Sequence, residues 1–195
     1  MPSRTPARHR AVRPRAVRPR AALAGLLLGA SLAMSCTGDP AATPAITPGT
    51  PDDPRDVIIV TKDYSYIPPI LDLVPGESVI LQVVNGGLVI HEVVIGGMGV
   101  QNAWEAAEAA TVGAPPGPTP RVSVAPEFAG LRVVVPSGAR VDVPWNVPTD
   151  APAEPGTWLV GCHIPGHWAL GMFAPVRFVG PDGQPLPTED ATAVR

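Results

Sequence analysis

Short runs of apolar residues, separated by glycine, proline and polar turns, occupy the chain from about residue 56 to residue 180. In residues 139–145, for example, valine and tryptophan alternate with arginine, aspartate and proline. Alternation with a period of two predicts β-strands that bury one face. The expected strands are residues 56–62, 70–74, 79–84, 88–97, 131–135, 139–145, 154–162 and 174–180. Short strands at this spacing predict an all-β fold, an antiparallel β-sandwich.

One segment between these strands has a helical pattern instead. In residues 102–110, Asn102 and Glu105 have the spacing of an N-terminal capping box. An apolar stripe runs along the same segment, formed by Ala103, Trp104, Ala107 and Ala110. We therefore expect one short helix that begins at Asn102, lies in an insertion and covers one edge of the sandwich. A helix that docks a partner is the alternative.

The N-terminal residues 1–35 have the composition of an export signal. Seven arginines precede a stretch of fourteen mostly apolar residues, 21–34, which is shorter than the roughly 20 residues that a membrane-spanning helix needs. Small residues then precede Cys36, and this junction resembles the lipobox of bacterial lipoproteins. We expect an exported protein, periplasmic or extracytoplasmic, tethered to the membrane by lipidation of Cys36. Plain secretion is the alternative.

Composition divides the rest of the chain into three parts. Residues 36–55 are a proline-rich linker, residues 56–180 form the folded domain, and residues 181–195 are a polar tail. Residues 36–195 carry seven of the 14 basic residues and all 17 acidic ones, a net charge of −10. This charge argues against binding to nucleic acid and is compatible with steering towards a basic protein partner. The alternative is a charged surface that only solvates the protein. We expect a monomer.

The side chains that can bind a metal are concentrated in the segment GCHIPGHWALGM, residues 161–172. It holds Cys162, His167 and Met172, with a Pro-Gly turn between the first two. His91, in the apolar run LVIHEVVI, is the one histidine outside this loop and the signal segment. Burying an imidazole without a partner costs roughly 1–3 kcal/mol, and metal binding would supply that partner.

This donor set indicates copper. Thiolate, imidazole and thioether are soft to borderline ligands, whereas Ca²⁺ and Mg²⁺ prefer oxygen and Zn²⁺ rarely takes a thioether. Two imidazoles and one thiolate with a distant methionine describe a mononuclear blue-copper site for electron transfer.

With these residues identified, the sequence resembles the cupredoxins, the family of small blue-copper proteins that includes plastocyanin and azurin. GTWLVGCHIPGHWALGM resembles their penultimate strand and ligand loop, and NGGLVIHEVVIG resembles the strand with the first histidine. The resemblance implies a Greek-key β-sandwich with one copper ion at one end. It also implies the ligands of this ion. The equatorial ligands would be His91, Cys162 and His167, and the axial ligand would be Met172.

The resemblance further implies that an apolar rim around His167 docks redox partners. Here that rim would consist of Pro165, Trp168 and Leu170; the alternative is that Trp168 and Leu170 belong to the core. Expected partners are redox proteins such as c-type cytochromes or a terminal oxidase.

Two residues depart from the pattern of better-known members. Many of those have asparagine directly after the first histidine, where this chain has Glu92, and His163 directly follows the cysteine. Our hypothesis is that Glu92 and His163 pair and tie the two ligand strands together. The alternative is two exposed polar residues.

Three classes of function remain to be compared. The first is a carrier of single electrons, and the alternative is a copper-binding module for storage, delivery or resistance. Delivery proteins often use segments rich in methionine, and two of this chain's four methionines lie in the signal segment. A multicopper enzyme needs more histidines than His163, the one left after His91 and His167 bind an ion. We therefore expect a carrier and no enzymatic activity.

Overall fold

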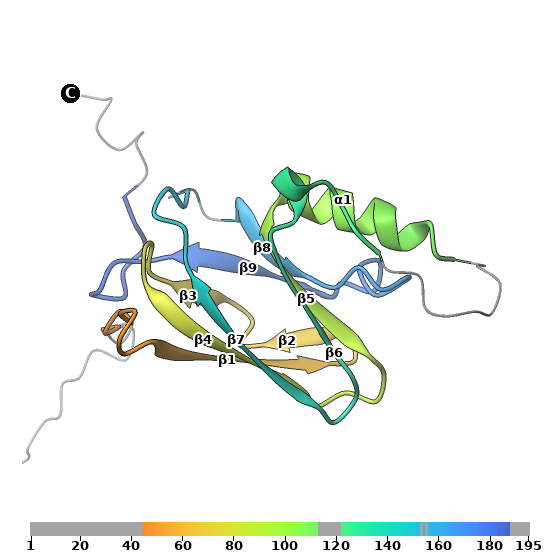
Figure 1. Ribbon diagram of the computed structural model, residues 1–195, viewed down its shortest axis with the longest axis horizontal. Coiled ribbons are helices and arrows are strands. Elements are labelled where there is room, and N and C mark those ends of the chain that lie inside the picture. Colours follow the sequence, from red (N-terminus) through yellow and green to blue (C-terminus); the bar gives the residue numbers. More distant parts are fainter. Residues whose placement is uncertain (1–44, 113–121, 153, 155, 188–195) are drawn as a thin grey trace, which may run out of the picture. The chain divides into compact units, whose positions relative to one another are not determined.

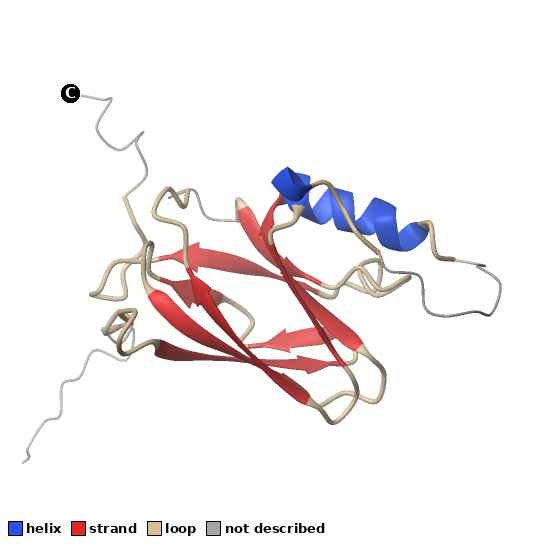
Figure 2. Cartoon of the chain, viewed as in Figure 1, coloured by secondary structure: helices blue, strands red, loops and turns tan. Residues whose placement is uncertain are grey.

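The computed structural model describes residues 45–112, 122–152, 154 and 156–187. Within them the chain forms strands with one α-helix and one short 3-10 helix (Figures 1 and 2). The elements are β1 Arg55–Lys62, β2 Ser65–Ile67, β3 Leu71–Leu73, β4 Ser78–Asn85, β5 His91–Gly97, α1 Met98–Ala109, η1 Pro126–Phe128, β6 Leu131–Val135, β7 Arg140–Asn146, β8 Trp158–Gly161 and β9 Phe173–Phe178. All the predicted strands are present: β6 has the predicted bounds, β1 and β4 are slightly longer than predicted, and the others are shorter or shifted. The short strand β2 was not predicted.

The strands form two sheets, with the orders β2-β1-β4-β7 and β3-β9-β8-β5-β6. The chain is a β-sandwich, as predicted, but the expectation of purely antiparallel sheets was wrong. β1 pairs with β4, and β3 pairs with β9, in parallel. The reason is that β3 joins the second sheet before the chain returns to β4, and such a crossover allows neighbouring strands to run in the same direction.

Alternating side chains from both sheets fill the core. In β1 the side chains of Val57, Ile59 and Thr61 are buried, whereas Ile58 between them is exposed. Leu81 and Val83 of β4 and Val93 and Ile95 of β5 lie in the same core cluster as Val57 and Ile59. The alternation of apolar and polar residues along the sequence therefore identifies which side chains of a strand point into the space between the two sheets.

β5 is buried on both faces because α1 covers the outer side of its sheet (Figure 1). The predicted start of the helix was wrong: α1 follows β5 directly, with Gly97 at its N-cap and no side-chain cap. Gly96 permits this sharp connection, since a Cβ there would lie 2.8 Å from Val100. The helix also covers the face of the sheet at β5 and β8 rather than an edge of the sandwich.

The two ends of the described chain lie together. The backbone N–H of Ile46 donates to the Pro181 carbonyl at 2.9 Å, and that of Ser78 donates to Gly49 at 3.0 Å. This end of the sandwich, where β1 and β4 begin and β9 ends, is opposite to the end where β5 begins. The expected signal segment and Cys36 lie outside the described residues. Among the residues described, no helix is both long enough and apolar enough to span a bilayer.

Candidate metal centre

Three elements bring the predicted ligands to one end of the sandwich. His91 is the first residue of β5, and Cys162 directly follows β8. β5 and β8 are neighbours in antiparallel pairing, so the start of one lies beside the end of the other. His167 and Met172 lie in the loop between β8 and β9. All four side chains face the space between the sheets and are buried.

The donor atoms of His91, Cys162 and His167 converge. One donor atom from each of these residues lies within 4.8 Å of the others. The Cys162 Sγ is 3.3 Å from Nδ1 of His167. The two imidazole rings are 5.1 Å apart between their centres. The cluster therefore presents a thiol and two imidazoles to a single small volume.

Backbone hydrogen bonds fix the loop that carries three of the predicted ligands. The Cys162 N–H donates to the Met172 carbonyl at 3.1 Å, and the Met172 N–H donates to the His167 carbonyl at 3.1 Å. The His167 N–H donates to Ile164 at 2.9 Å. Gly166 adopts a φ of 90°, which allows the tight turn before His167. Met172, itself completely buried, is thus bonded through its backbone to two members of the cluster.

His91 has one nitrogen bonded and one nitrogen free. Its Nε2 lies 2.6 Å from Oδ1 of Asp63, in the turn between β1 and β2. Its Nδ1 is buried without a hydrogen-bond partner among the described residues. Buried polar atoms without a partner are uncommon, because such a group loses its hydration without compensation. A metal ion bound to Nδ1 would satisfy it.

The protonation of the cluster suits a ligand site. Burial raises the pKa of the Cys162 thiol to about 12. Burial, with the neighbouring His91 adding to it, lowers the pKa of His167, although Asp63 opposes this effect. At neutral pH His167 is therefore a neutral imidazole, the form that binds metals, and a metal that binds Cys162 releases the thiol proton.

Glu92 and His163 face the opposite side of their sheet, because each follows a ligand by one position in the chain. The backbone N–H of His163 donates to Oε1 of Glu92 at 2.8 Å, which links the two ligand strands. The imidazole of His163 does not contact Glu92. It lies 2.7 Å from Oε1 of Gln101 and 2.9 Å from Oε2 of Glu105, both on α1. Neither Glu92 nor His163 is exposed, because α1 covers them.

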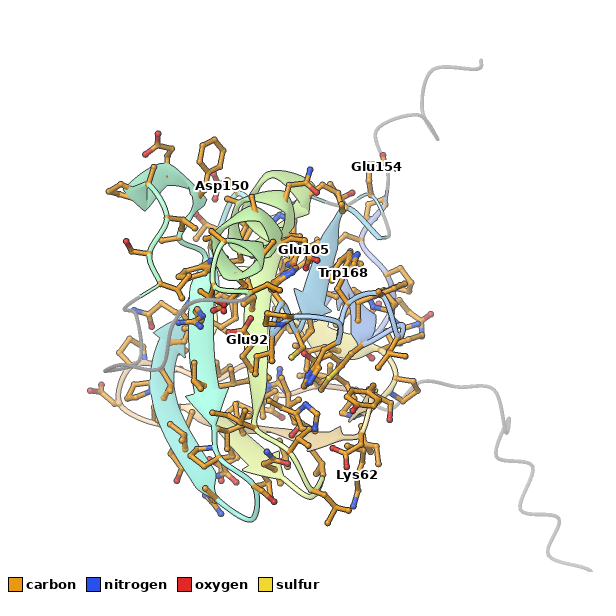
Figure 3. All side chains as sticks on the ribbon, turned by 90° about the vertical axis from the view of Figure 1, so that its right-hand side faces the viewer. Lys62, Glu92, Glu105, Asp150, Glu154 and Trp168 are labelled. Atoms are coloured by element: carbon orange, nitrogen blue, oxygen red, sulfur yellow. The ribbon has the colours of Figure 1, made fainter. Side chains whose placement is uncertain are left out.

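A buried charge network extends this link. Arg132 of β6 donates from Nε to Glu92 at 2.7 Å and from a terminal nitrogen to Glu108 of α1 at 2.6 Å. Its guanidinium also lies 4.4 Å from the centre of the Trp104 ring. In Figure 3, Glu92 and Glu105 are labelled beside the helix. Glu92 and His163, which directly follow the ligands His91 and Cys162 in the chain, are therefore held in place by side chains of α1 and β6.

The three residues of the predicted docking rim lie in different environments. Pro165 is exposed, and the Leu170 side chain is 61% exposed. Trp168 is only half-buried and stacks on the His163 ring, with centres 4.9 Å apart and planes at 21° (Figure 3 labels Trp168). Trp168 also contacts the ring of Phe173. Trp168 thus packs on the outer face of the sheet beside α1, away from the cluster.

Comparisons with known proteins give structural neighbours only. No family model matches the chain, and no curated protein sequence matches it. Auracyanin B is similar in structure, with 23% identity, 72% of this chain and 100% of that chain covered, and a TM-score of 0.49. Auracyanin A of Chloroflexus aurantiacus, named as a blue copper protein, is 19% identical in sequence; the match covers 63% of this chain and 97% of that chain, with a TM-score of 0.43. An azurin of Methylomonas sp. strain J is 14% identical in sequence; the match covers 65% of this chain and 98% of that chain, with a TM-score of 0.45.

These likenesses are below 25% identity and below a TM-score of 0.5, so the fold is assigned on the chain's own features. Two packed sheets carry a His-Cys-His cluster at the end where β5 begins. The chain is therefore assigned a β-sandwich fold with a candidate metal site at one end. The His91, Cys162 and His167 group of this domain suits a single type 1 copper ion.

Sequence analysis missed two residues that contact the predicted ligands. Asp63 binds His91, and Tyr64 packs its ring edge against both histidine rings, 6.0 Å from His91 and 4.8 Å from His167 between centres. Both lie in a turn some 30 positions before the first histidine, and no spacing rule links them to it. The one signal was the polar pair Lys62-Asp63 at the end of an apolar strand.

Proposed function

We propose that this chain is an exported, mononuclear type 1 copper protein that carries single electrons between redox partners. The observation that carries the proposal is the buried convergence of one thiol and two imidazoles beside a buried methionine. Bound to such donors, copper supplies a one-electron Cu(II)/Cu(I) couple. In each cycle the protein accepts one electron from a reduced partner, which is thereby oxidised, and gives that electron to a second, oxidised partner.

The rigidity of the cluster supports a carrier over a delivery protein. The ligand loop is closed by its own backbone hydrogen bonds, and the residues beside both ligand strands are tied by Glu92 and α1. Rigid ligands of this kind resist rearrangement when the charge of the ion changes. A delivery protein must instead open its site to release the ion, and buried ligands held from several elements oppose such opening.

The surface next to His167 is the proposed docking site. Pro165 and Leu170 are exposed in the loop on either side of this histidine, which is itself 8% exposed. An apolar, weakly exposed ligand edge allows brief contact with a partner such as a c-type cytochrome or a terminal oxidase. The acidic composition of residues 36–195 favours partners with a basic surface.

Export and tethering complete the proposal. The composition of residues 1–35 supports an export signal, and Cys36 is the proposed site of lipidation. The domain would then act outside the cytoplasm, in the periplasm or at the outer face of the membrane, as a monomer at the end of a proline-rich linker.

Electron exchange with a small, basic, reduced c-type cytochrome tests the carrier function. The copper-loaded protein is mixed with the cytochrome, and oxidation of the haem is followed by stopped flow. We expect Leu170→Ser to lower the bimolecular rate constant and to leave the reduction potential unchanged. The matched control is Val112→Ser, because Val112 is similarly exposed, at 68%, but lies beyond the end of α1.

A second readout separates the carrier from the alternative, a copper storage or delivery module. The Cu(I)-loaded protein is challenged with an excess of a Cu(I) chelator. A carrier keeps its copper over the time of many electron transfers. Rapid loss of Cu(I) to the chelator, together with slow electron exchange, would contradict the carrier function and favour copper handling.

A further inference from the structure

The turn between β1 and β2 is a fourth element of the metal centre. It places the Asp63 carboxylate 2.6 Å from Nε2 of His91, and the Asp63 side chain is 27% exposed. The next residue, Tyr64, packs its ring against His91 and His167. The first histidine is therefore in contact with a charged group as well as with apolar core residues.

The neighbouring loop holds Asp63 in this position. Oδ2 of Asp63 accepts the backbone N–H of Leu88 at 2.8 Å. Gly87 leaves the space that the carboxylate needs, since a Cβ at this position would lie 2.3 Å from Oδ1 of Asp63 and 2.8 Å from Nε2 of His91. Loop and side chain together form a built contact to the imidazole.

This contact determines which nitrogen of His91 carries the proton. A carboxylate accepts hydrogen bonds and donates none, so Nε2 must carry the hydrogen. Nδ1 is then left with a free electron pair, and it is the buried nitrogen that has no partner. A carboxylate bonded to a ligand imidazole also orients the ring and makes it a stronger donor.

We propose that Asp63 is a positioning residue of the copper site, which fixes the tautomer of His91 and stabilises Cu(II) relative to Cu(I). The inference rests on the proposed function and adds to it the residue that lowers the reduction potential. A stronger donor and a nearby negative charge both favour the ion of higher charge. Asp63 acts through His91 and is not itself a ligand in this proposal.

The test compares Asp63→Asn with Asp56→Asn. Asparagine keeps a side chain of the same size that can accept the His91 hydrogen, but it removes the charge. Asp56 is an exposed carboxylate near the start of β1, the strand that ends directly before Asp63, and lies roughly 23 Å from Asp63 at the rise of an extended strand. It controls for the loss of one negative charge from the protein.

Two readouts are needed. In Asp63→Asn we expect the ratio of Cu(II) to Cu(I) affinity to fall about tenfold, which raises the one-electron potential by about 59 mV. In the metal-free protein, nuclear magnetic resonance of ¹⁵N-labelled histidine should show His91 protonated at Nε2 in the wild type. A mixture of tautomers is expected in Asp63→Ala, and Asp56→Asn should match the wild type in both readouts.

The inference is overturned if Asp63→Asn moves the potential no more than Asp56→Asn does, or if Asp63→Ala leaves the His91 tautomer unchanged. This failure differs from failure of the proposed function. In the former, the wild-type protein is blue and redox-active but insensitive to Asp63. In the latter, the wild type forms no thiolate–copper complex at all, while the tautomer test on the metal-free protein still reports on Asp63.

Discussion

The buried charge network behind the ligand strands makes Arg132 the most sensitive position outside the cluster. Arg132→Met keeps much of the length of the side chain but removes its charge and its donors. Glu92 then loses the donor that now lies 2.7 Å away, and Glu108 loses the one at 2.6 Å. Glu92 has no exposed side-chain surface and Glu108 has 8%, so water cannot replace the lost partner.

The expected cost follows from this burial. Removal of one partner from a buried ion pair costs about 3–5 kcal/mol. Arg132 is itself 23% exposed, so we expect the lower limit, about 3 kcal/mol of unfolding free energy. For a domain of this size such a loss lowers the melting temperature by about 10 °C.

Urea unfolding of the metal-free protein, followed by tryptophan fluorescence, measures this loss. Arg140→Met is the control, because Arg140 also makes two charged hydrogen bonds, both to Asp142, at 2.6 and 2.9 Å, but on an exposed surface. Exposed pairs of this kind contribute about 0–1 kcal/mol. Adding Glu92→Gln to Arg132→Met should recover part of the stability, since the unpaired buried charge is then gone.

If Arg132→Met and Arg140→Met destabilise the protein equally, the argument from burial is wrong. The same conclusion follows if the added Glu92→Gln makes the Arg132→Met protein still less stable.

Three further predictions concern the residues around the ligands. Gln101→Leu leaves the buried His163 Nε2 without its partner, and we expect a loss of about 1–3 kcal/mol in thermal unfolding; no change would contradict the role of α1. Glu92→Gln removes the charge that holds the His163 N–H, so copper should be lost faster to a chelator with a shifted reduction potential; equal retention and an equal potential would refute the tie between the ligand strands. The folded-state pKa of Cys162, about 12, lies above its ordinary value of 9.0, so the metal-free fold should lose stability as the pH rises from about 9 towards 12. Cys162→Ser should make this slope in urea unfolding smaller, and the part that stays is expected from Tyr66, whose pKa burial also raises; an unchanged slope would contradict the role of Cys162.

The sequence predicted the strands better than it predicted their pairing. Alternation of apolar and polar residues identifies which side chains point inward, as Val57 and Ile59 show, but it does not say which strand is the neighbour. The parallel pairing of β1 with β4 depends on β3 crossing to the other sheet, a long-range choice that local pattern does not contain.

The helix illustrates a second limit. A capping box predicts a start at Asn102, yet the fold continues β5 directly into α1 through Gly96 and Gly97. Tertiary packing decides this start, since the helix must reach the sheet at Gln101. The buried face of α1 carries Gln101 and Glu108, polar residues that a search for apolar stripes passes over.

The donor set was readable because three of its members share one loop and the fourth, His91, is the one histidine of residues 36–195 outside that loop. Asp63 was not readable, because its contact with His91 arises from the arrangement of the β1–β2 turn against the Gly87 loop. Residues that bind the metal can be recognised in the sequence from the chemistry of their side chains. Residues that orient a ligand, such as Asp63, can be recognised only from their contact with that ligand in the structure.

The visible absorption spectrum of residues 45–195 loaded with Cu(II) tests the central claim most directly. The account predicts an intense blue thiolate-to-copper band that bleaches on one-electron reduction, returns on oxidation and is absent in Cys162→Ser. A colourless copper complex in the wild type, or a spectrum that Cys162→Ser leaves unchanged, would contradict it.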